Sequence, residues 1–96
     1  LTALVFSSDY YAAEAVMFYQ EKGIDVPGQI SITGFDDNIF ARLIRPRLTS
    51  VHQDAYAKGR SAIEILLRLI RHESVPETDV RLPVHLEIRD SVRKLP

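Results

Sequence analysis

Short apolar runs alternate along the chain with longer segments whose apolar residues repeat at helical spacing. The apolar run over residues 1–7 predicts a buried strand, and residues 10–22 predict a helix that ends at Gly23. Two further apolar runs predict strands over residues 30–35 and 48–51. Between them, the Asp-Asp-Asn sequence predicts the cap of a short helical turn that runs through Phe40 to Leu43.

The longest predicted helix covers residues 54–72 and carries a wide apolar stripe, which indicates packing on more than one neighbour. After a polar loop, residues 80–84 and 86–89 predict one or two terminal strands. Strands and helices therefore alternate along the whole chain. This order predicts an α/β fold, in which helices flank a parallel sheet joined by right-handed crossovers.

The composition indicates a globular segment without a nucleic-acid surface. The 96 residues are 46% hydrophobic and carry a net charge of −1, so any DNA binding by the parent protein must come from another segment. The absence of cysteine excludes disulfides, and no apolar run reaches the roughly 20 residues that cross a bilayer. Because the chain opens with a buried strand at Leu1 and shows no signal peptide, we expect further residues to precede it.

Five phrases occur in order and at natural spacing along nearly the whole chain, and together they resemble the bacterial transcriptional regulators of the lactose-repressor/galactose-repressor (LacI/GalR) type. Each phrase is weak alone, but the ordered combination is specific. The phrases are Val5-Phe6-Ser7-Ser8-Asp9 with the alanine-rich residues 12–15, Gly23-Ile24-Asp25-Val26-Pro27 with Ile30-Ser31-Ile32-Thr33-Gly34-Phe35-Asp36-Asp37, Pro46 to Asp54, Gly59 to Leu67, and Leu82 to Ser91.

The resemblance implies a core of two α/β subdomains, similar to periplasmic sugar-binding proteins, between which the chain crosses three times. Residues 1–51 would belong to the second subdomain, and the helix over 54–72 would pack on the first. Residues 79–91 would form terminal strands that return across the hinge. Most of the first subdomain and the N-terminal helix-turn-helix would then lie outside this sequence.

The resemblance also implies a function. The chain would sense a small-molecule effector, a sugar or a related compound, and would form a homodimer. DNA would be bound only through the N-terminal domain. The protein would be cytoplasmic, without membrane attachment, cofactor, metal or enzyme activity.

Asp36 and Asp37 are the first candidate site residues because they directly follow a predicted buried strand. In open parallel sheets, ligands bind beyond the carboxyl ends of the strands, and a carboxylate there accepts two hydrogen bonds from vicinal hydroxyls. The resemblance assigns the effector contact to Asp36. The alternative is that one aspartate caps the next turn while the other is solvated. We expect Asp37 to have one of these two roles.

Three further positions are expected near the same cleft. Ser8 stands where the family often has an asparagine that forms a hydrogen bond to the effector. Serine is shorter and offers only a hydroxyl group, so the resemblance leaves open whether Ser8 contacts the effector. Asp9 is expected to cap the following helix rather than to touch a ligand. Gln53 would line the cleft at a crossing, with a surface amide as the alternative, and His52 is expected to be solvated.

The first helix is apolar nearly all round, which is typical of deep burial or of an interface. The family dimerises through this helix and through the loop after Asp-Asp. Ordinary packing within the chain is the alternative for each residue. The residues predicted at the dimer interface are Tyr10, Ala13, Met17, Phe40, Leu43 and Ile44.

Two other function classes are alternatives to the regulator. A periplasmic sugar-binding protein of a transport system would share the fold without the DNA-binding domain, but the Gly-Phe-Asp-Asp and Pro-x-Leu-Thr-Ser phrases favour the regulator. A phosphoryl-transfer enzyme or receiver domain would place magnesium at Asp36 and Asp37. No partnering lysine, phosphate-binding glycine loop or nucleophile–base pair supports it.

Overall fold

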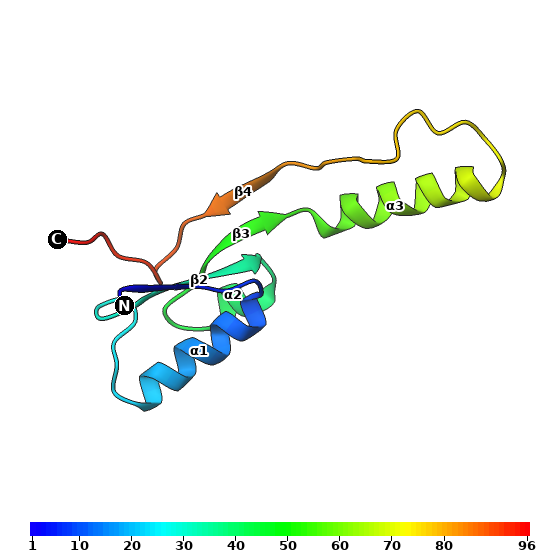
Figure 1. Ribbon diagram of the computed structural model, residues 1–96. Coiled ribbons are helices and arrows are strands. Elements are labelled where there is room, and N and C mark those ends of the chain that lie inside the picture. The colour runs from blue at the N-terminus through cyan, green and yellow to red at the C-terminus, as the bar shows by residue number, and fades with distance from the viewer. The chain divides into compact units, whose positions relative to one another are not determined.

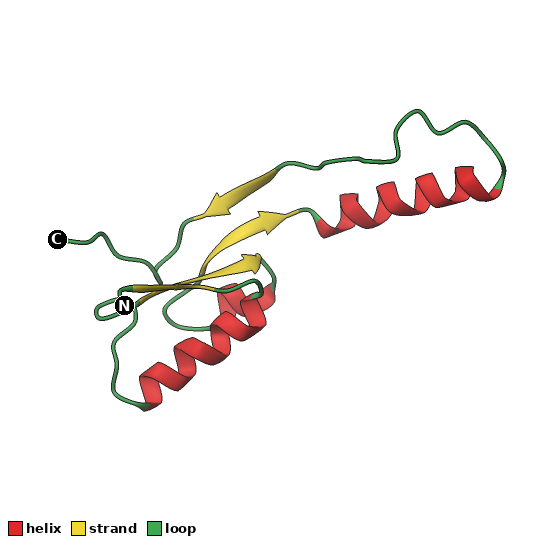
Figure 2. Ribbon diagram, viewed as in Figure 1, coloured by secondary structure: helices red, strands yellow, loops and turns green.

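The computed structural model describes all 96 residues, which divide into two compact units. The first unit contains residues 1–52 and 85–96, and the second contains residues 53–84. Helices and strands alternate as the sequence predicts (Figures 1 and 2). The elements are β1 (Ala3–Val5), α1 (Asp9–Glu21), β2 (Ser31–Asp36), α2 (Ile39–Leu43), β3 (Thr49–Gln53), α3 (Ala55–Ile70) and β4 (Val84–Glu87).

The strands form one sheet in the order β1-β2-β3-β4. β1 pairs in parallel with β2, and β2 in parallel with β3, with Asp36 of β2 opposite His52 of β3. These three strands confirm the predicted parallel α/β sheet. β4 runs in the opposite direction to β3 (Figure 1), so the sheet as a whole is mixed. The chain leaves the first unit along β3 and returns along β4, and an adjacent return strand of this kind is antiparallel.

The core of the first unit lies between the sheet and the helix α1, beside which α2 packs. Ala12 and Val16 of α1 meet Ile32 of β2 and Leu48 before β3, and all four side chains are fully buried. Burying a Val, Leu or Ile side chain contributes roughly 1.5–3 kcal/mol each. These residues therefore hold α1 against β2, the strand that ends at Asp36.

The ends of α1 follow from its sequence. The Ser8 hydroxyl accepts a hydrogen bond from the N–H of Tyr10, which makes Ser8 the N-cap. At the other end, Gly23 has a φ of 76°, and the N–H of Ile24 donates to the carbonyl of Tyr19. This is a Schellman motif, which favours glycine at the residue with positive φ, and it confirms the predicted helix end.

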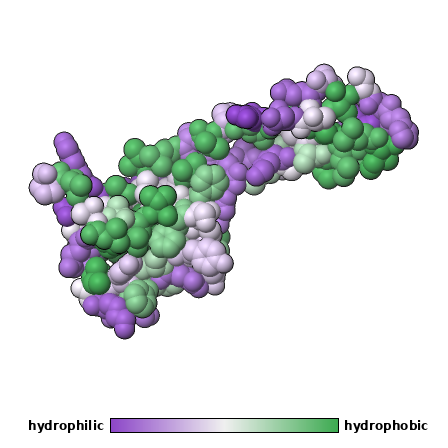
Figure 3. Space-filling model, viewed as in Figure 1, coloured by the Kyte–Doolittle hydropathy of each residue, from purple (hydrophilic) through white to green (hydrophobic).

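In the second unit, α3 begins after Asp54, whose side chain accepts a hydrogen bond from the N–H of Ala57. None of its residues is buried, and its apolar stripe is exposed (Figure 3). The strand predicted over residues 80–84 is wrong, because strand structure begins only at Val84. Pro83 lacks the N–H that a paired strand residue donates, which is one reason why the strand starts after it.

Ser91 joins β2 to β3 at the amino ends of these strands. Its side chain is fully buried, and its hydroxyl donates to the carbonyl of Ile32 and accepts from the N–H of Thr49. Two residues later, the N–H of Arg93 donates to the hydroxyl of Ser31. The C-terminal segment is therefore held against the sheet at least as far as Arg93.

No helix has the length and apolar character needed to cross a bilayer.

Candidate functional site

Asp36 is the last residue of β2 and lies at the carboxyl edge of the sheet, where the parallel strands end. This is the position that the sequence predicts. Its φ is 105°, and that of Asp37 is 57°, so two successive residues other than glycine have left-handed backbone conformations. Such conformations cost of order 1–3 kcal/mol each and persist only where surrounding contacts impose them, which is common at binding sites. The effector contact of Asp36 remains a prediction.

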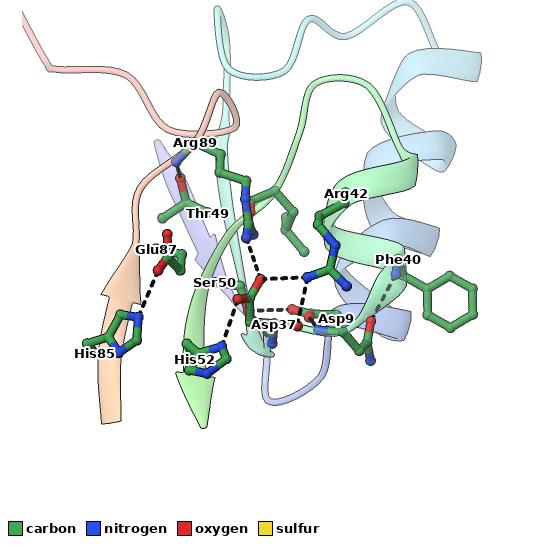
Figure 4. Close-up of polar contacts among 12 residues, drawn as sticks. Asp9, Asp37, Phe40, Arg42, Thr49, Ser50, His52, His85, Glu87 and Arg89 are labelled. Atoms are coloured by element: carbon green, nitrogen blue, oxygen red, sulfur yellow. Dashed lines mark hydrogen bonds and ion pairs between the residues drawn. The ribbon is translucent and has the colours of Figure 1, made fainter. Parts of the chain in front are cut away.

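Asp37 is the centre of a network of charged side chains (Figure 4). Its side chain is only 6% exposed, with Oδ1 2.5 Å from Nη2 of Arg89 and Oδ2 2.8 Å from Nδ1 of His52. Nη1 of Arg42 lies 3.8 Å from Oδ1. The expectation that Asp37 either caps the next turn or is solvated is therefore wrong. Asn38 is the N-cap of α2, and cationic groups from α2 and from the segment after β4 enclose Asp37 together with His52 of β3.

Two opposing effects set the pKa of Asp37. Burial raises it, but the hydrogen bonds from Arg89 and His52, with the positive charges beside them, lower it by more, so the pKa lies below its ordinary value. Asp37 is therefore ionised at neutral pH and serves as the counter-ion of Arg89. The guanidinium of Arg89 also donates to the carbonyl of Leu48, so it joins the loop after β2 to the start of β3.

His52 is also not simply solvated, contrary to the expectation. Besides its contact with Asp37, its ring lies against that of His85, with the ring centroids 4.8 Å apart and an angle of 31° between the planes. Nε2 of His85 lies 2.7 Å from Oε1 of Glu87. The network thus continues from the loop after β2 through β3 to β4 (Figure 4).

Asp9 has a different role from the predicted helix cap, which Ser8 provides. It is fully buried, and it accepts hydrogen bonds from the hydroxyl of Ser50 at 2.6 Å and from the N–H of Asn38 at 2.8 Å. Asn38 in turn caps α2 by accepting from the N–H of Phe40, as the sequence predicts. Asp9 therefore connects α1 to β3 and to the loop that carries Asp36.

Ser8 and Gln53 stay open as ligand contacts. The Ser8 hydroxyl already accepts a hydrogen bond as the N-cap of α1, which leaves its proton for a further partner. Gln53 is the last residue of β3 and the first of the second unit, where it lines a cavity of about 350 Å³ with Asp54 and Lys58.

The residues predicted at the dimer interface divide into two groups. Tyr10, Met17, Phe40 and Leu43 are exposed, and the rings of Tyr10 and Phe40 lie edge to face with centroids 5.5 Å apart. Ala13 is only 3% exposed, and Ile44 packs against the core. Ala13 therefore offers almost no side-chain surface to a partner. The exposed side chains of the predicted interface are those of Tyr10, Met17, Phe40 and Leu43.

Three polar residues that hold the site together could not be predicted from the sequence, Ser50, His85 and Arg89. The side chain of Arg89 is only 16% exposed, although an arginine near the end of a chain is normally solvated. The sequence carries one weak signal of this arrangement. Ser50 and His52 lie two residues apart, on the same face of a strand that ends at the same edge as Asp36. The structure contains no group of three or more His, Asp and Glu side chains that could hold a metal ion.

Comparison with known proteins places this arrangement in a family. The family model of the periplasmic binding protein-like domain matches residues 2–92. The chain is 41% identical over 76 residues to the HTH-type transcriptional regulator GalR of Escherichia coli, an alignment that covers 79% of this chain and 22% of the relative.

Two solved structures show the same fold. The transcriptional regulator CelR in complex with cellobiose matches with a TM-score of 0.88 and 28% identity, over 95% of this chain and 28% of that chain. The lac repressor dimer bound to operator and the anti-inducer ONPF matches with a TM-score of 0.84 and 31% identity, over 95% and 32%.

The chain thus spans less than a third of the length of these proteins. Two of the three are transcriptional regulators by name, and the third is a repressor bound to its operator. The chain belongs to the periplasmic binding protein-like domain family, and within that family to the LacI/GalR type.

Proposed function

We propose that this chain is the effector-sensing and dimerising part of a DNA-binding transcriptional regulator. Membership of the LacI/GalR type supports this, and the single observation that carries it is the position of Asp36. The residue lies at the carboxyl edge of a parallel sheet, in a backbone conformation that surrounding contacts must impose. A side chain held in this way is suited to meeting a ligand in a fixed direction.

The proposed effector is a sugar or a related polyol. The carboxyl group of Asp36 can accept a hydrogen bond from each of two neighbouring hydroxyl groups, and sugars and polyols carry such pairs of hydroxyl groups. One of the similar regulators was solved with cellobiose bound. Ser8 at the same edge and Gln53 where the chain leaves β3 would add a hydroxyl and an amide to the site.

The proposed division of the parent protein follows the family. Residues 1–51 would belong to one subdomain, α3 would pack on the other, and residues 79–91 would return across the hinge. The exposed apolar stripe of α3 supports this, because an exposed stripe of that kind normally packs against a partner surface. A helix-turn-helix elsewhere in a cytoplasmic homodimer would bind DNA, and effector binding would favour one arrangement of the subdomains.

Calorimetry on the intact regulator tests the effector site. With a panel of cellobiose, D-galactose, D-ribose and D-xylulose, we expect at least one sugar to bind and Asp36→Ala to raise its Kd by at least about tenfold, since hydrogen bonds to a charged group contribute roughly 1.5–3 kcal/mol each. Asp25→Ala, which removes an exposed carboxyl group before β2, is the matched control and should leave the Kd unchanged. Equal affinity of the Asp36→Ala variant and the parent would remove Asp36 from the site.

The dimer interface is tested at Leu43, whose side chain is 65% exposed beside Phe40 on α2. Placing a charge there, Leu43→Asp, is expected to weaken dimerisation by at least about tenfold because a buried interface carboxylate without a partner is unfavourable. Sedimentation velocity over a concentration series measures the change. Leu95→Asp, at another exposed leucine, should leave the dimer intact. An unchanged dimer in the Leu43→Asp variant would place the interface elsewhere.

A further inference from the structure

Asp9 is buried beneath the loop that follows β2, and its carboxyl group joins three segments that are distant in the sequence. One oxygen accepts from the hydroxyl of Ser50 on β3, and the other accepts from the N–H of Asn38. Figure 4 shows Asp9, Ser50 and Asp37 close together at the end of the sheet. Asp9 itself lies in the first turn of α1, which the core residues hold against β2.

Ser50 holds a second backbone group of the same loop. Its oxygen also accepts a hydrogen bond from the N–H of Asp37 at 3.1 Å. The two backbone N–H groups that follow Asp36 are therefore both held, that of Asn38 by Asp9 directly and that of Asp37 through Ser50. These are contacts that oppose relaxation of the left-handed conformations at Asp36 and Asp37.

Neither Asp9 nor Ser50 is placed to touch a ligand. Both are fully buried, and every buried side-chain nitrogen and oxygen atom in the structure has a hydrogen-bond partner within the protein. The close approach of Asp9 to β2 also depends on Gly34, because a Cβ atom at that position would overlap Oδ1 of Asp9. Any effect of Asp9 and Ser50 on effector binding must therefore act through the backbone that carries Asp36.

We propose that Asp9 and Ser50 are positioning residues that fix the direction of the Asp36 carboxyl group toward a polyhydroxyl effector. The inference rests on the proposed function, because it assigns a use to the rigidity of the Asp36 loop. Without these anchors, the loop would relax and Asp36 would meet the hydroxyl groups in a range of directions. Affinity would then fall although every group that touches the ligand is still present.

The test is a double-mutant cycle between Ser50→Ala and Asp36→Ala in the intact regulator, measured by calorimetry with the tightest-binding sugar of the same panel. Ser50→Ala should raise the Kd by about five- to tenfold when Asp36 is present, the size expected for one misdirected hydrogen-bonding group. In the Asp36→Ala background, the same substitution should change the Kd by less than about twofold, since no carboxyl group remains to be positioned. Asp9→Asn should follow the same pattern.

Ser91→Ala is the matched control, because Ser91 is also a fully buried serine that joins β2 to β3, but at the other end of the strands. It should lower stability to a similar extent without changing the Kd. An unchanged Kd for Ser50→Ala, or an equal loss of affinity with and without Asp36, would overturn the inference while leaving the effector role of Asp36 intact. If Asp36→Ala binds as the parent does, or if no sugar binds, the proposed function fails and this inference fails with it.

Discussion

Replacing Gly34 by alanine is expected to lower the free energy of unfolding by about 3 kcal/mol, as the sum of overpacking and the loss of two hydrogen bonds to a buried carboxyl group. The added Cβ would overlap Oδ1 of Asp9 and would lie 2.7 Å from Cδ2 of Leu48. Neither group has room to move, because both side chains are fully buried. Displacing Asp9 would also break its hydrogen bonds to Ser50 and Asn38.

Lys94→Ala is the control for this substitution. Lys94 is exposed and follows Arg93, the last residue whose backbone is held against the sheet. Its replacement should change the free energy of unfolding by less than about 0.5 kcal/mol. Urea denaturation of the intact regulator measures both variants. Equal midpoints for Gly34→Ala and the parent would show that Asp9 is not confined as described.

Replacing Arg89 by methionine should cost about 2 kcal/mol, because the ionised Asp37 would remain largely buried with only part of its charge compensated. Methionine keeps much of the length and apolar surface of the arginine stem but donates no hydrogen bond. The substitution removes the ion pair to Asp37 and the hydrogen bond to the carbonyl of Leu48. His52 and Arg42 still face Asp37, which is why the expected loss is below that of a fully isolated buried charge.

Arg93→Met is the matched control, because the side chain of Arg93 is exposed and only its backbone N–H contacts the sheet. Its free energy of unfolding should stay within about 0.5 kcal/mol of the parent. A second variant checks the cause of the loss at Arg89. If the Asp37–Arg89 pair is responsible, Arg89→Met should lower the free energy of unfolding by less in the Asp37→Asn background than in the parent. Equal effects of Arg89→Met and Arg93→Met would show that the network does not stabilise the protein.

Local patterns predicted most of the fold. The helix that ends at Gly23, the cap at Asn38 and the apolar runs of β2 and β3 each depend on residues next to one another in the chain. The direction of β4 was not predictable in this way. It depends on where the chain returns after the second unit, and periodicity within a short strand carries no information about its direction.

The site was predicted less completely than the fold. The position of Asp36 at the carboxyl edge follows from its place directly after a strand. The partners of Asp37 do not, because Arg89 lies 52 residues away along the chain and nothing near it marks a buried arginine. Asp9 shows the same difficulty: an aspartate beside a helix start reads as a cap, but its actual partner Ser50 is 41 residues away.

The network joins the loop that carries Asp36 to β3 and to the segment after β4. Asp37 binds Arg89 beyond β4 and contacts His52 on β3, while the next residue, Asn38, is held by Asp9. A change in the direction of β3 or β4 would therefore strain the loop that carries Asp36.

A crystal structure of the intact regulator with its sugar bound is the most direct measurement of the proposed site. We predict that the carboxyl oxygens of Asp36 lie within about 3 Å of two neighbouring hydroxyl groups of the sugar, the usual length of such hydrogen bonds. A sugar bound away from the carboxyl edge of β2, or an Asp36 side chain directed away from it, would contradict the proposed site.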